Sequence, residues 1–483
     1  MIADTPQALV DAADRHVREG NLEQAALLYR QAAERDPNDE DARVGLEYVE
    51  YRTRRGGTTS GILGSGESRD LTPLQKSNQD LNRREFQKRR LRLESAPTQL
   101  TIESTTKCNY HCRTCMKGYG AYYAEDLRED VLARIGAEIL PTVTHTGITG
   151  FGEPTLSRRF DELLTMVVRN HSSVHLVTNG SLLSFARIER IVSRPVSVAI
   201  SVDGASKDTF EWIRQGGRFE RILKKLAMIK RLRAIYGGRA SFMLNFVGLR
   251  ANIHELAGVV RLAARYGIEA VHVEDYEFHG HSFDEQSLRN EPARANRCME
   301  EARTVAAQLG VTLELPPPYS AEAARPRRAS FWQKLRRIRG IFSEPGRFPR
   351  RCHSPWSEPY VRADGVVTPC CISDQYLGDL KKTSFGRIWN GWRYRLLRRR
   401  VRSPLPPLKC RGCVAWWGIN GGNAGNAIAR EGLVVKALYF LEYRIRALTE
   451  RMRVCLRRLG VARTSSPAPN YHRGKPCRNE PSS

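Results

Sequence analysis

Three cysteines lie close together in the first third of the chain, Cys108, Cys112 and Cys115, in a C-x₃-C-x₂-C pattern. Cysteine thiolates hold iron–sulfur clusters, and three thiolates on a four-iron cluster leave one iron open for another donor. A structural zinc ion takes four ligands. No fourth cysteine lies nearby, and His111 would have to crowd the loop to serve. The spacing therefore favours a [4Fe–4S] cluster, with zinc or three unrelated buried thiols as alternatives.

A second set of cysteines occurs near the C-terminus. It comprises Cys352, Cys370, Cys371, Cys410 and Cys413. Asp364-Gly365 between β-rich runs predicts a hairpin turn, which we expect to bring Cys352 and Cys370 together on paired strands. Cys410 and Cys413 then close the set as a C-x₂-C pair. From spacing alone, a four-cysteine zinc site and an iron–sulfur site both remain open.

Short apolar segments alternate with helical patterns between residues 96 and 310, which indicates a parallel sheet. We expect strands near Gln99–Glu103, His145–Gly150, Val174–Asn179, Ser197–Asp203, Ser241–Val247 and Ala270–Glu277. Six units are fewer than the eight of a closed barrel. The expected fold class is therefore α/β: a partial (β/α)₆ barrel, with a small C-terminal α+β domain that carries the second cysteine set and an N-terminal helical repeat-like segment. Chemistry in such barrels lies at the C-terminal strand ends, and the first cysteine loop follows the first strand.

A glycine-rich turn follows the second strand. Gly150, Gly152 and Glu153 belong to the run G-F-G-E-P. Glycines let the backbone approach a ligand closely, and Glu153 offers an acceptor for an ammonium group. Turns of this composition are common. The position of this one directly after a strand makes it a candidate for ligand binding.

The strand, the C-x₃-C-x₂-C loop and the partial barrel together resemble the radical S-adenosylmethionine (SAM) superfamily. The resemblance implies that the open iron binds the amino and carboxylate groups of SAM. Electron transfer into the sulfonium then breaks the C5′–S bond, and a 5′-deoxyadenosyl radical takes a hydrogen atom from the substrate. It also implies that the Gly150–Pro154 turn corresponds to the motif that holds the methionine amino group. Thr114 departs from the family pattern, in which a large residue often packs near the adenine.

Further polar residues follow the third to fifth strands. Asn179 lies at the end of the third, and Ser201 and Asp203 share one face of the fourth. Ser201 and Asp203 are candidates for contacts with the ribose hydroxyls, with strand-end capping as the alternative. Asn245 and Asn252 are candidates for the same pocket, although Asn252 equally fits a helix N-cap.

The segment from Ala205 to Gly217 resembles superfamily members with additional C-terminal clusters, and Arg214 within it is expected to face the cofactor. The motifs C-x₂-P-W, D-G-x-V-x-P-C-C, I-W-N-G and C-x₂-C after residue 351 resemble their SPASM/Twitch extension. The resemblance implies one auxiliary [4Fe–4S] cluster, because the two-cluster form needs about seven cysteines. The implied ligands are Cys352, Cys370, Cys410 and Cys413, with Cys371 as a neighbour or substitute.

The domain organisation follows from these patterns. We expect a helical, tetratricopeptide-like segment (1–53), a linker with a basic helix (54–95), the radical SAM barrel (96–310), a basic connector (311–351), the SPASM/Twitch domain (352–424) and a basic helical tail with a disordered end (425–483). A single repeat is too short to stand alone, so the first segment must dock or dimerise; an ordinary helical cap is the alternative.

Composition sets the remaining expectations. The net charge of +26 favours anionic partners, although an Arg-rich codon bias explains it equally well. Six arginines between residues 393 and 402 suggest either an anion-binding surface or a solvated helix face. No nucleic-acid-binding motif occurs, so no nucleic acid is expected. The tail could make peripheral membrane contact or cover the barrel. No secretory signal and no apolar run long enough to span a bilayer occur, so we expect a cytoplasmic protein.

The expected function is that of a radical SAM oxidoreductase that oxidises or rearranges a small polar or anionic molecule, such as a sugar or aminocyclitol. A flavodoxin- or ferredoxin-type protein is the expected electron donor. The alternatives are a maturase that modifies a peptide or protein and a non-catalytic metal-binding scaffold. The sequence identifies no general base; Glu274, Tyr276 and His279 are positional candidates only.

Overall fold

The computed structural model describes residues 5–56, 70–115, 125–276, 284–319, 352–371, 373, 375–401, 407 and 410. Residues Met1–Ala427 form one compact unit, and Ile428–Ser483, none of which is described, form a second. The predicted basic tail and Cys413 therefore lie outside the described residues, as does most of the basic connector. Among the described residues, no helix is both long and apolar enough to cross a membrane.

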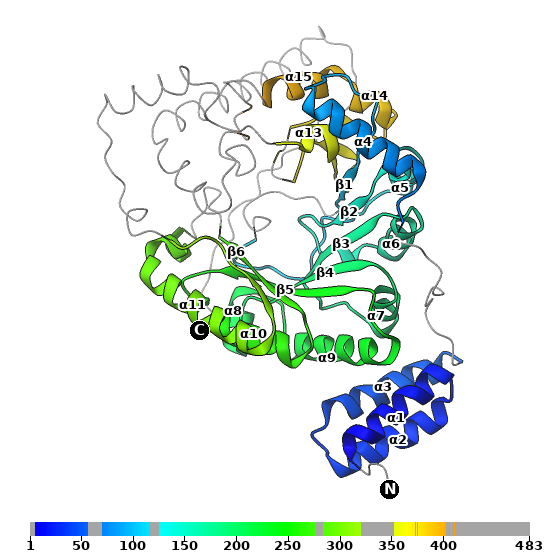
Figure 1. Ribbon diagram of the computed structural model, residues 1–483, viewed down its shortest axis with the longest axis vertical. Helices are drawn as coiled ribbons and strands as arrows, with labels where there is room; N and C mark the ends of the chain where they lie inside the picture. Colours follow the sequence, from blue (N-terminus) through cyan, green and yellow to red (C-terminus); the bar gives the residue numbers. More distant parts are fainter. Residues whose placement is uncertain are drawn as a thin grey trace, which may run out of the picture. The chain divides into compact units, whose positions relative to one another are not determined.

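Helices and strands alternate along most of the described chain (Figure 1). The helices are α1 (Pro6–Glu19), α2 (Leu22–Arg35), α3 (Glu40–Arg54), α4 (Pro73–Gln87), α5 (Glu129–Glu138), α6 (Phe160–Arg169), α7 (Phe185–Val192), α8 (Lys207–Ile213), α9 (Phe219–Tyr236), α10 (Leu256–Arg265), α11 (Pro292–Leu309), α13 (Ser354–Ser357), α14 (Phe385–Trp389) and α15 (Trp392–Val401). The strands are β1 (Gln99–Ile102), β2 (His145–Ile148), β3 (Ser173–Thr178), β4 (Val196–Ser201), β5 (Ser241–Gly248), β6 (Ala270–Asp275), β7 (Thr312–Glu314), β8 (Tyr360–Val361), β9 (Val366–Thr368) and β10 (Gly378–Asp379).

All the strands join one sheet in the order β10-β9-β8-β1-β2-β3-β4-β5-β6-β7. Strands β1 to β6 confirm the six predicted strands, and each pairs in parallel with the next. The sheet continues beyond residue 310, where the alternating pattern was expected to stop. Strand β7 pairs in parallel with β6, and its three residues are too few to show a periodic pattern. The sheet is thus a parallel partial barrel with an added C-terminal edge.

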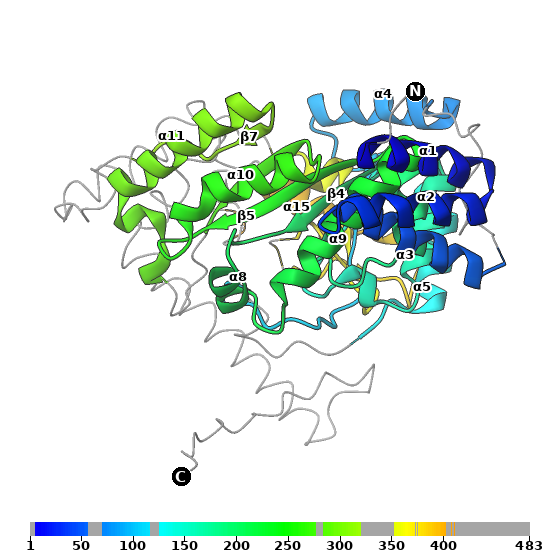
Figure 2. The same ribbon diagram turned by 90° about the horizontal axis from the view of Figure 1, so that it is seen from below.

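Helices cover the outer face of this sheet (Figures 1 and 2). Helix α6 shows why: its buried positions Phe160, Leu163, Leu164, Val167 and Val168 recur at helical spacing along one stripe. This stripe packs on the alternate buried residues of strands such as β3. The remaining strand positions face the interior of the partial barrel.

The N-terminal segment docks on the barrel helices α7 and α9, as its short length predicted. Asp14 of α1 forms a buried ion pair with Arg231 of α9. The hydroxyl of Tyr48 donates to the carboxylate of Glu189 on α7. A likeness to tetratricopeptide repeats stays a prediction, because three docked helices do not by themselves define that family.

The C-terminal region extends the barrel sheet at its first strand. Strand β8 pairs in parallel with β1 and antiparallel with β9, and Gly365 turns the β8–β9 hairpin with φ +80°. The predicted hairpin at Asp364-Gly365 is therefore confirmed. The expectation that Cys352 and Cys370 lie on its paired strands is wrong, because Cys352 precedes helix α13 and Cys370 follows β9. Helix α13 lies between Cys352 and the hairpin, and the sequence pattern did not predict this short helix.

Candidate active site

The first cysteine loop is held at the C-terminal end of β1 by backbone hydrogen bonds from both sides. The amide of Glu153 donates to the carbonyl of Lys107 at 2.8 Å. The amide of His111 donates to the carbonyl of Gln215, and that of Arg113 donates to the carbonyl of Ile213, the last residue of α8. Cys108, Cys112 and Cys115 form no disulfide bonds and are half-buried. Within the described residues, no three metal-binding side chains converge on a position for a single ion. A cluster, in which each thiolate binds a separate iron, makes no such demand.

A buried ion pair lies directly behind this loop. The guanidinium of Arg214 is 2.8 Å from the carboxylate of Asp203, and both side chains are almost fully buried. Another nitrogen of Arg214 lies 3.9 Å from the sulfur of Cys112. Burial raises the pKa of the Cys112 thiol to about 11, and Arg214 partly opposes that shift. The loop is therefore backed by a cation that favours negative charge on its central sulfur.

The position of Asp203 bears on its expected contact with ribose. Its carboxylate faces Arg214 and also accepts the backbone amide of Val247 at 2.8 Å. The side chain is fully buried. A ribose contact stays a prediction, but the observed partners of Asp203 are protein groups. Ser201 lies two residues earlier on β4, is nearly buried, and shares its register position with Asn245 of β5.

The glycine turn packs against the backbone of the cysteine loop. A β-carbon on Gly152 would lie 2.2 Å from the carbonyl oxygen of Thr105 and 2.6 Å from that of Lys107. A β-carbon on Gly150 would lie 2.6 Å from the side chain of Glu103. Real β-carbons do not approach other atoms so closely. The turn thus needs both glycines to touch the segment that leads into Cys108.

Glu153 binds protein donors in the described structure. Its carboxylate accepts the amide and hydroxyl of Thr155, the hydroxyl of Thr178 at 2.5 Å and the amide of Asn179 at 2.7 Å. Asn179 in turn donates its side-chain amide to Asn109 of the cysteine loop at 3.0 Å. Direct contact of Glu153 with an ammonium group stays a prediction. These hydrogen bonds instead show that the carboxylate joins the turn to the end of β3.

Sequence reasoning missed Glu103, the last residue before the cysteine loop diverges from β1. One oxygen of its buried carboxylate accepts the amide of Phe151 at 2.9 Å, and the other accepts the amide of Ala363 at 3.3 Å. Burial raises the pKa of Glu103, and these two amides oppose the shift. Glu103 therefore connects the glycine turn to the β8–β9 hairpin. An acidic residue at an otherwise apolar strand end was the available signal.

Asn252 occupies the N-cap position of the helical turn Ile253–Glu255, but its side chain forms no capping hydrogen bond there. Its side-chain amide donates to the carbonyls of Asp203 and Val247, and its oxygen accepts the amide of Leu249. The side chain is fully buried. The N-cap position is therefore confirmed without its capping bond, and a contact of Asn252 with the cofactor pocket stays a prediction. Asn245 instead donates to Glu274 of β6 at 3.1 Å, on the interior side of the sheet.

The second cysteine set is described in part. Cys352, Cys370 and Cys410 form no disulfide bonds and are half-buried, whereas Cys371 is exposed. Cys352 and Cys410 both pack against the hydrophobic core. These placements favour Cys370 over Cys371 as a ligand, and the full ligand set stays a prediction because Cys413 is outside the described residues.

The motif residues around these cysteines attach the region to the barrel. The indole of Trp356 donates to the carbonyl of Arg90, and that of Trp389 donates to the carbonyl of Ser95. The side chain of Asn390 both accepts from and donates to the backbone of Leu93. These bonds hold the segment that leads into β1 and the first cysteine loop.

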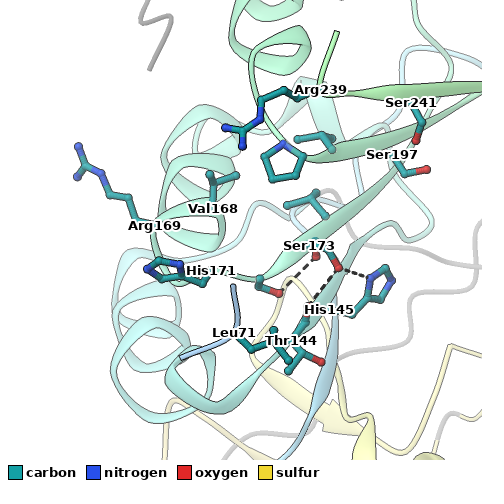
Figure 3. A pocket seen from close by; sticks show the side chains of 14 residues that line it. Leu71, Thr144, His145, Val168, Arg169, His171, Ser173, Ser197, Arg239 and Ser241 are labelled. Carbon is teal, nitrogen blue, oxygen red and sulfur yellow. Dashed lines mark hydrogen bonds between the residues drawn. The ribbon is translucent and has the colours of Figure 1, made fainter. Parts of the chain in front are cut away.

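A cavity of about 560 Å³ opens at the opposite end of the sheet. Thr144, Ser173, Ser197 and Ser241 line it at the starts of β2 to β5, and His145 bonds to Ser173 at its edge (Figure 3). The cysteine loop follows the C-terminal end of β1, so this cavity is remote from the candidate chemistry. Its volume alone does not identify it as the active site.

Comparison with known families matches these two regions. Residues 102–263 match the Radical SAM superfamily, and residues 352–414 match SPASM, an iron–sulfur cluster-binding domain. The chain carries a radical SAM domain and a SPASM domain. The cofactors of this pair are a [4Fe–4S] cluster with SAM in the first domain and auxiliary iron–sulfur binding in the second.

Several curated relatives and solved structures are similar to the chain. It is 28% identical over 173 residues to mycofactocin maturase MftC of Mycolicibacterium smegmatis, covering 36% of this chain and 43% of the relative. It is 24% identical over 297 residues to sporulation killing factor maturation protein SkfB of Bacillus subtilis, covering 60% and 64%. Streptococcus suis SuiB bound to precursor peptide SuiA aligns with a TM-score of 0.48 at 16% identity, covering 75% and 80%. The chain thus spans less than half the length of the mycofactocin maturases.

The residues present fit a SAM-binding cluster. Three cysteines without disulfide bonds share one loop, and the buried Nε of Arg214 has no hydrogen-bond partner within the described residues. An anionic ligand group beside Cys112 would satisfy that nitrogen, since a buried polar atom without a partner is costly. The methionine carboxylate of SAM is such a group. The radical SAM domain therefore has both a cysteine set and a guanidinium nitrogen without a hydrogen-bond partner that fit its cofactor.

Proposed function

We propose that the protein is a radical SAM maturase that modifies a peptide or protein substrate. Its radical chemistry is supported by the C-x₃-C-x₂-C loop within the matched radical SAM region and by Arg214, which lies 3.9 Å from the sulfur of Cys112. The substrate class is supported by relatives named as a maturase and a maturation protein, one of which aligns over 60% of this chain. The docked N-terminal helices are consistent with it, because helical repeats often present surfaces to peptides.

In this proposal Cys108, Cys112 and Cys115 hold the cluster, and Arg214 binds the methionine carboxylate while Asp203 keeps its guanidinium in place. The bound cofactor supplies the 5′-deoxyadenosyl radical. Gly152 brings backbone groups of its turn close to the cysteine loop, where they can accept the methionine ammonium. Protein residues supply binding and orientation, and the chemistry belongs to the cofactor.

In the SPASM domain we propose a single auxiliary [4Fe–4S] cluster on Cys352, Cys370, Cys410 and Cys413. Four cysteine ligands leave no iron open, so the cluster would exchange electrons rather than bind the substrate. Glu103 joins the two regions, because its carboxylate binds an amide of the glycine turn and an amide of the hairpin next to β1.

Oxidation of a small polar molecule is the second candidate. It is favoured by the polar pair Asn245 and Glu274, which lies on the interior side of adjacent strands. Such a pair would bind a hydroxyl or an ammonium group of a compact substrate.

The deciding experiment uses the anaerobically reconstituted protein with SAM and dithionite. Peptides encoded beside the gene and a panel of sugars and aminocyclitols are added separately, and 5′-deoxyadenosine and product masses are measured. The maturase proposal expects 5′-deoxyadenosine formation coupled to a mass change in one peptide. Turnover with a small molecule and no peptide would overturn the substrate class. A Cys108→Ala/Cys112→Ala/Cys115→Ala variant that still cleaves SAM would overturn the radical assignment.

A further inference from the structure

The exposed face of helix α15 carries an aromatic and basic cluster that no role above uses. Trp392 is 60% exposed, Leu396 is 41% exposed, and Tyr376 from the segment before β10 is 43% exposed. The guanidinium of Arg393 stacks on both rings, 4.7 Å from the Trp392 centroid and 5.1 Å from that of Tyr376. Large aromatic side chains and arginine are enriched at interaction hot spots. We name Tyr376, Trp392, Arg393, Arg395, Leu396 and Arg399 the α15 patch.

All the charged residues of the α15 patch are positive. Helix α15 contains five arginines and no acidic residue. Arg398 is not part of the surface, because it is buried between Trp389 and Tyr394 and donates to the carbonyls of Leu91 and Pro355. Arg395 and Arg399 are exposed beside Leu396. A positive patch with an aromatic centre is complementary to an acidic protein surface.

The opposite face of the same helix points toward the auxiliary-cluster region. Its buried residues include Tyr394, Leu397 and Arg398, and α15 packs against α13, which begins two residues after Cys352. Arg398 donates to the carbonyl of Pro355 in α13 at 2.9 Å. An α-helix with its side chains is about 10–12 Å across. A protein seated on the α15 patch would therefore lie about one helix diameter from α13, the helix that follows the proposed cluster ligand Cys352.

We propose that the α15 patch is the docking site of an acidic one-electron carrier protein of the flavodoxin or ferredoxin class. The inference rests on the proposed function, in which each SAM cleavage requires one electron. The reduced carrier loses that electron on the patch and the protein gains it through the SPASM region. Charge complementarity selects the carrier, and the packing of α15 against α13, next to the proposed ligand Cys352, favours a redox partner over a substrate peptide.

The test compares two sets of variants of the reconstituted holoenzyme. Arg395→Glu/Arg399→Glu reverses the charge of the patch, and Trp392→Ala removes its aromatic centre without changing charge. The matched control is Arg294→Glu/Arg303→Glu on α11, whose arginines are 41% and 59% exposed and pair only with neighbours on or beside that helix. Binding of a purified acidic flavodoxin is measured directly at low and high salt. SAM cleavage is then measured with reduced flavodoxin and with dithionite.

Both patch variants are expected to weaken flavodoxin binding by about tenfold or more and to slow flavodoxin-driven cleavage, because steering and anchoring are lost. Dithionite is a small reductant that needs no docking surface, so its rate should stay near that of the control. Unchanged flavodoxin binding in both patch variants would overturn the proposal. An equal loss with dithionite would also overturn it, since the patch would then be structural. Weaker binding of a substrate peptide with normal flavodoxin binding would assign the patch to the substrate.

Failure of this inference is distinguishable from failure of the proposed function. If the unaltered holoenzyme cleaves no SAM with dithionite, the proposed function fails, yet the direct binding measurement still decides the docking surface. If cleavage with dithionite is normal and flavodoxin binds the patch variants unchanged, only the docking inference fails.

Discussion

The carboxylate of Asp203 lies 2.8 Å from the guanidinium of Arg214, and the pair is enclosed behind Cys112. Buried ions persist only when each has a partner, because removal from water is costly for both. This pair is formed by the end of β4 and the residue after α8, which fixes the segment that touches the cysteine loop from behind. The position of the cysteine loop therefore depends on a buried ion pair, and removing one of its charges should lower the free energy of unfolding.

Asp203→Asn should destabilise the protein by about 3 kcal/mol, because it leaves the buried Arg214 cation without its counter-charge. Asparagine retains an oxygen that can accept the amide of Val247, so the loss of stability measures the removal of the negative charge alone. Urea unfolding under anaerobic conditions measures it. The control is Asp130→Asn, which breaks an exposed pair with Arg128 and should change stability by less than about 0.5 kcal/mol. Equal effects of the two substitutions would contradict the account.

Gly152→Ala should abolish tight SAM binding and lower the iron content of the first cluster. The new β-carbon would collide with the carbonyl oxygens of Thr105 and Lys107, so the chain entering Cys108 must move. Iron analysis and equilibrium dialysis with SAM measure these losses. The matched control is Gly386→Ala, since a β-carbon there meets nothing within 4 Å and alanine favours the helix α14. Normal SAM affinity in Gly152→Ala would show that the turn tolerates displacement.

The sequence predicted the parts of the fold that depend on local patterns. The strands β1 to β6 are apolar runs bounded by turn residues, and the three N-terminal helices show clear periodicity and capping residues. Strand β7 was missed because three residues carry no period. The pairing of β8 with β1 was also missed, because two residues far along the chain give no local sign of which edge they join.

The candidate site was also predicted only where its residues lie close together in the sequence. Residue type and spacing identified Cys108, Cys112 and Cys115, because a metal site requires its ligand chemistry close together in sequence. The partners of Glu153 and Asp203 could not be predicted, since they depend on how Thr178 and Arg214 pack in three dimensions. A carboxylate near a cofactor motif was interpreted as a ligand contact, yet both carboxylates bind protein groups.

Cys370→Ala should reduce the iron bound after reconstitution from about eight to about four per chain, whereas Cys371→Ala should leave it unchanged. The side chain of Cys370 is half-buried, as expected of a cluster ligand, whereas Cys371 is exposed. Iron and sulfide analysis with electron paramagnetic resonance of the reduced protein provides the measurement. Loss of four irons in Cys371→Ala with full content in Cys370→Ala would exchange their roles. Iron near four per chain in the unaltered protein would exclude an auxiliary cluster of this type.

Stability should fall as the pH decreases from about 7.5 to about 5.5, in part through two histidines of the sheet. Partial removal from water lowers the pKa of the half-buried His175 on β3 and of His145 on the neighbouring strand β2, whose side chain is the more exposed of the two. Because the folded-state pKa lies below the unfolded one, the unfolded chain binds more protons as the pH falls through the histidine range, and unfolding becomes more favourable. Urea unfolding across this range should show a smaller slope in His145→Gln and His175→Gln. His254→Gln serves as the control for replacing a histidine, because that side chain is 52% exposed and lies outside the sheet. A slope that none of the three substitutions alters would assign the pH dependence to other groups.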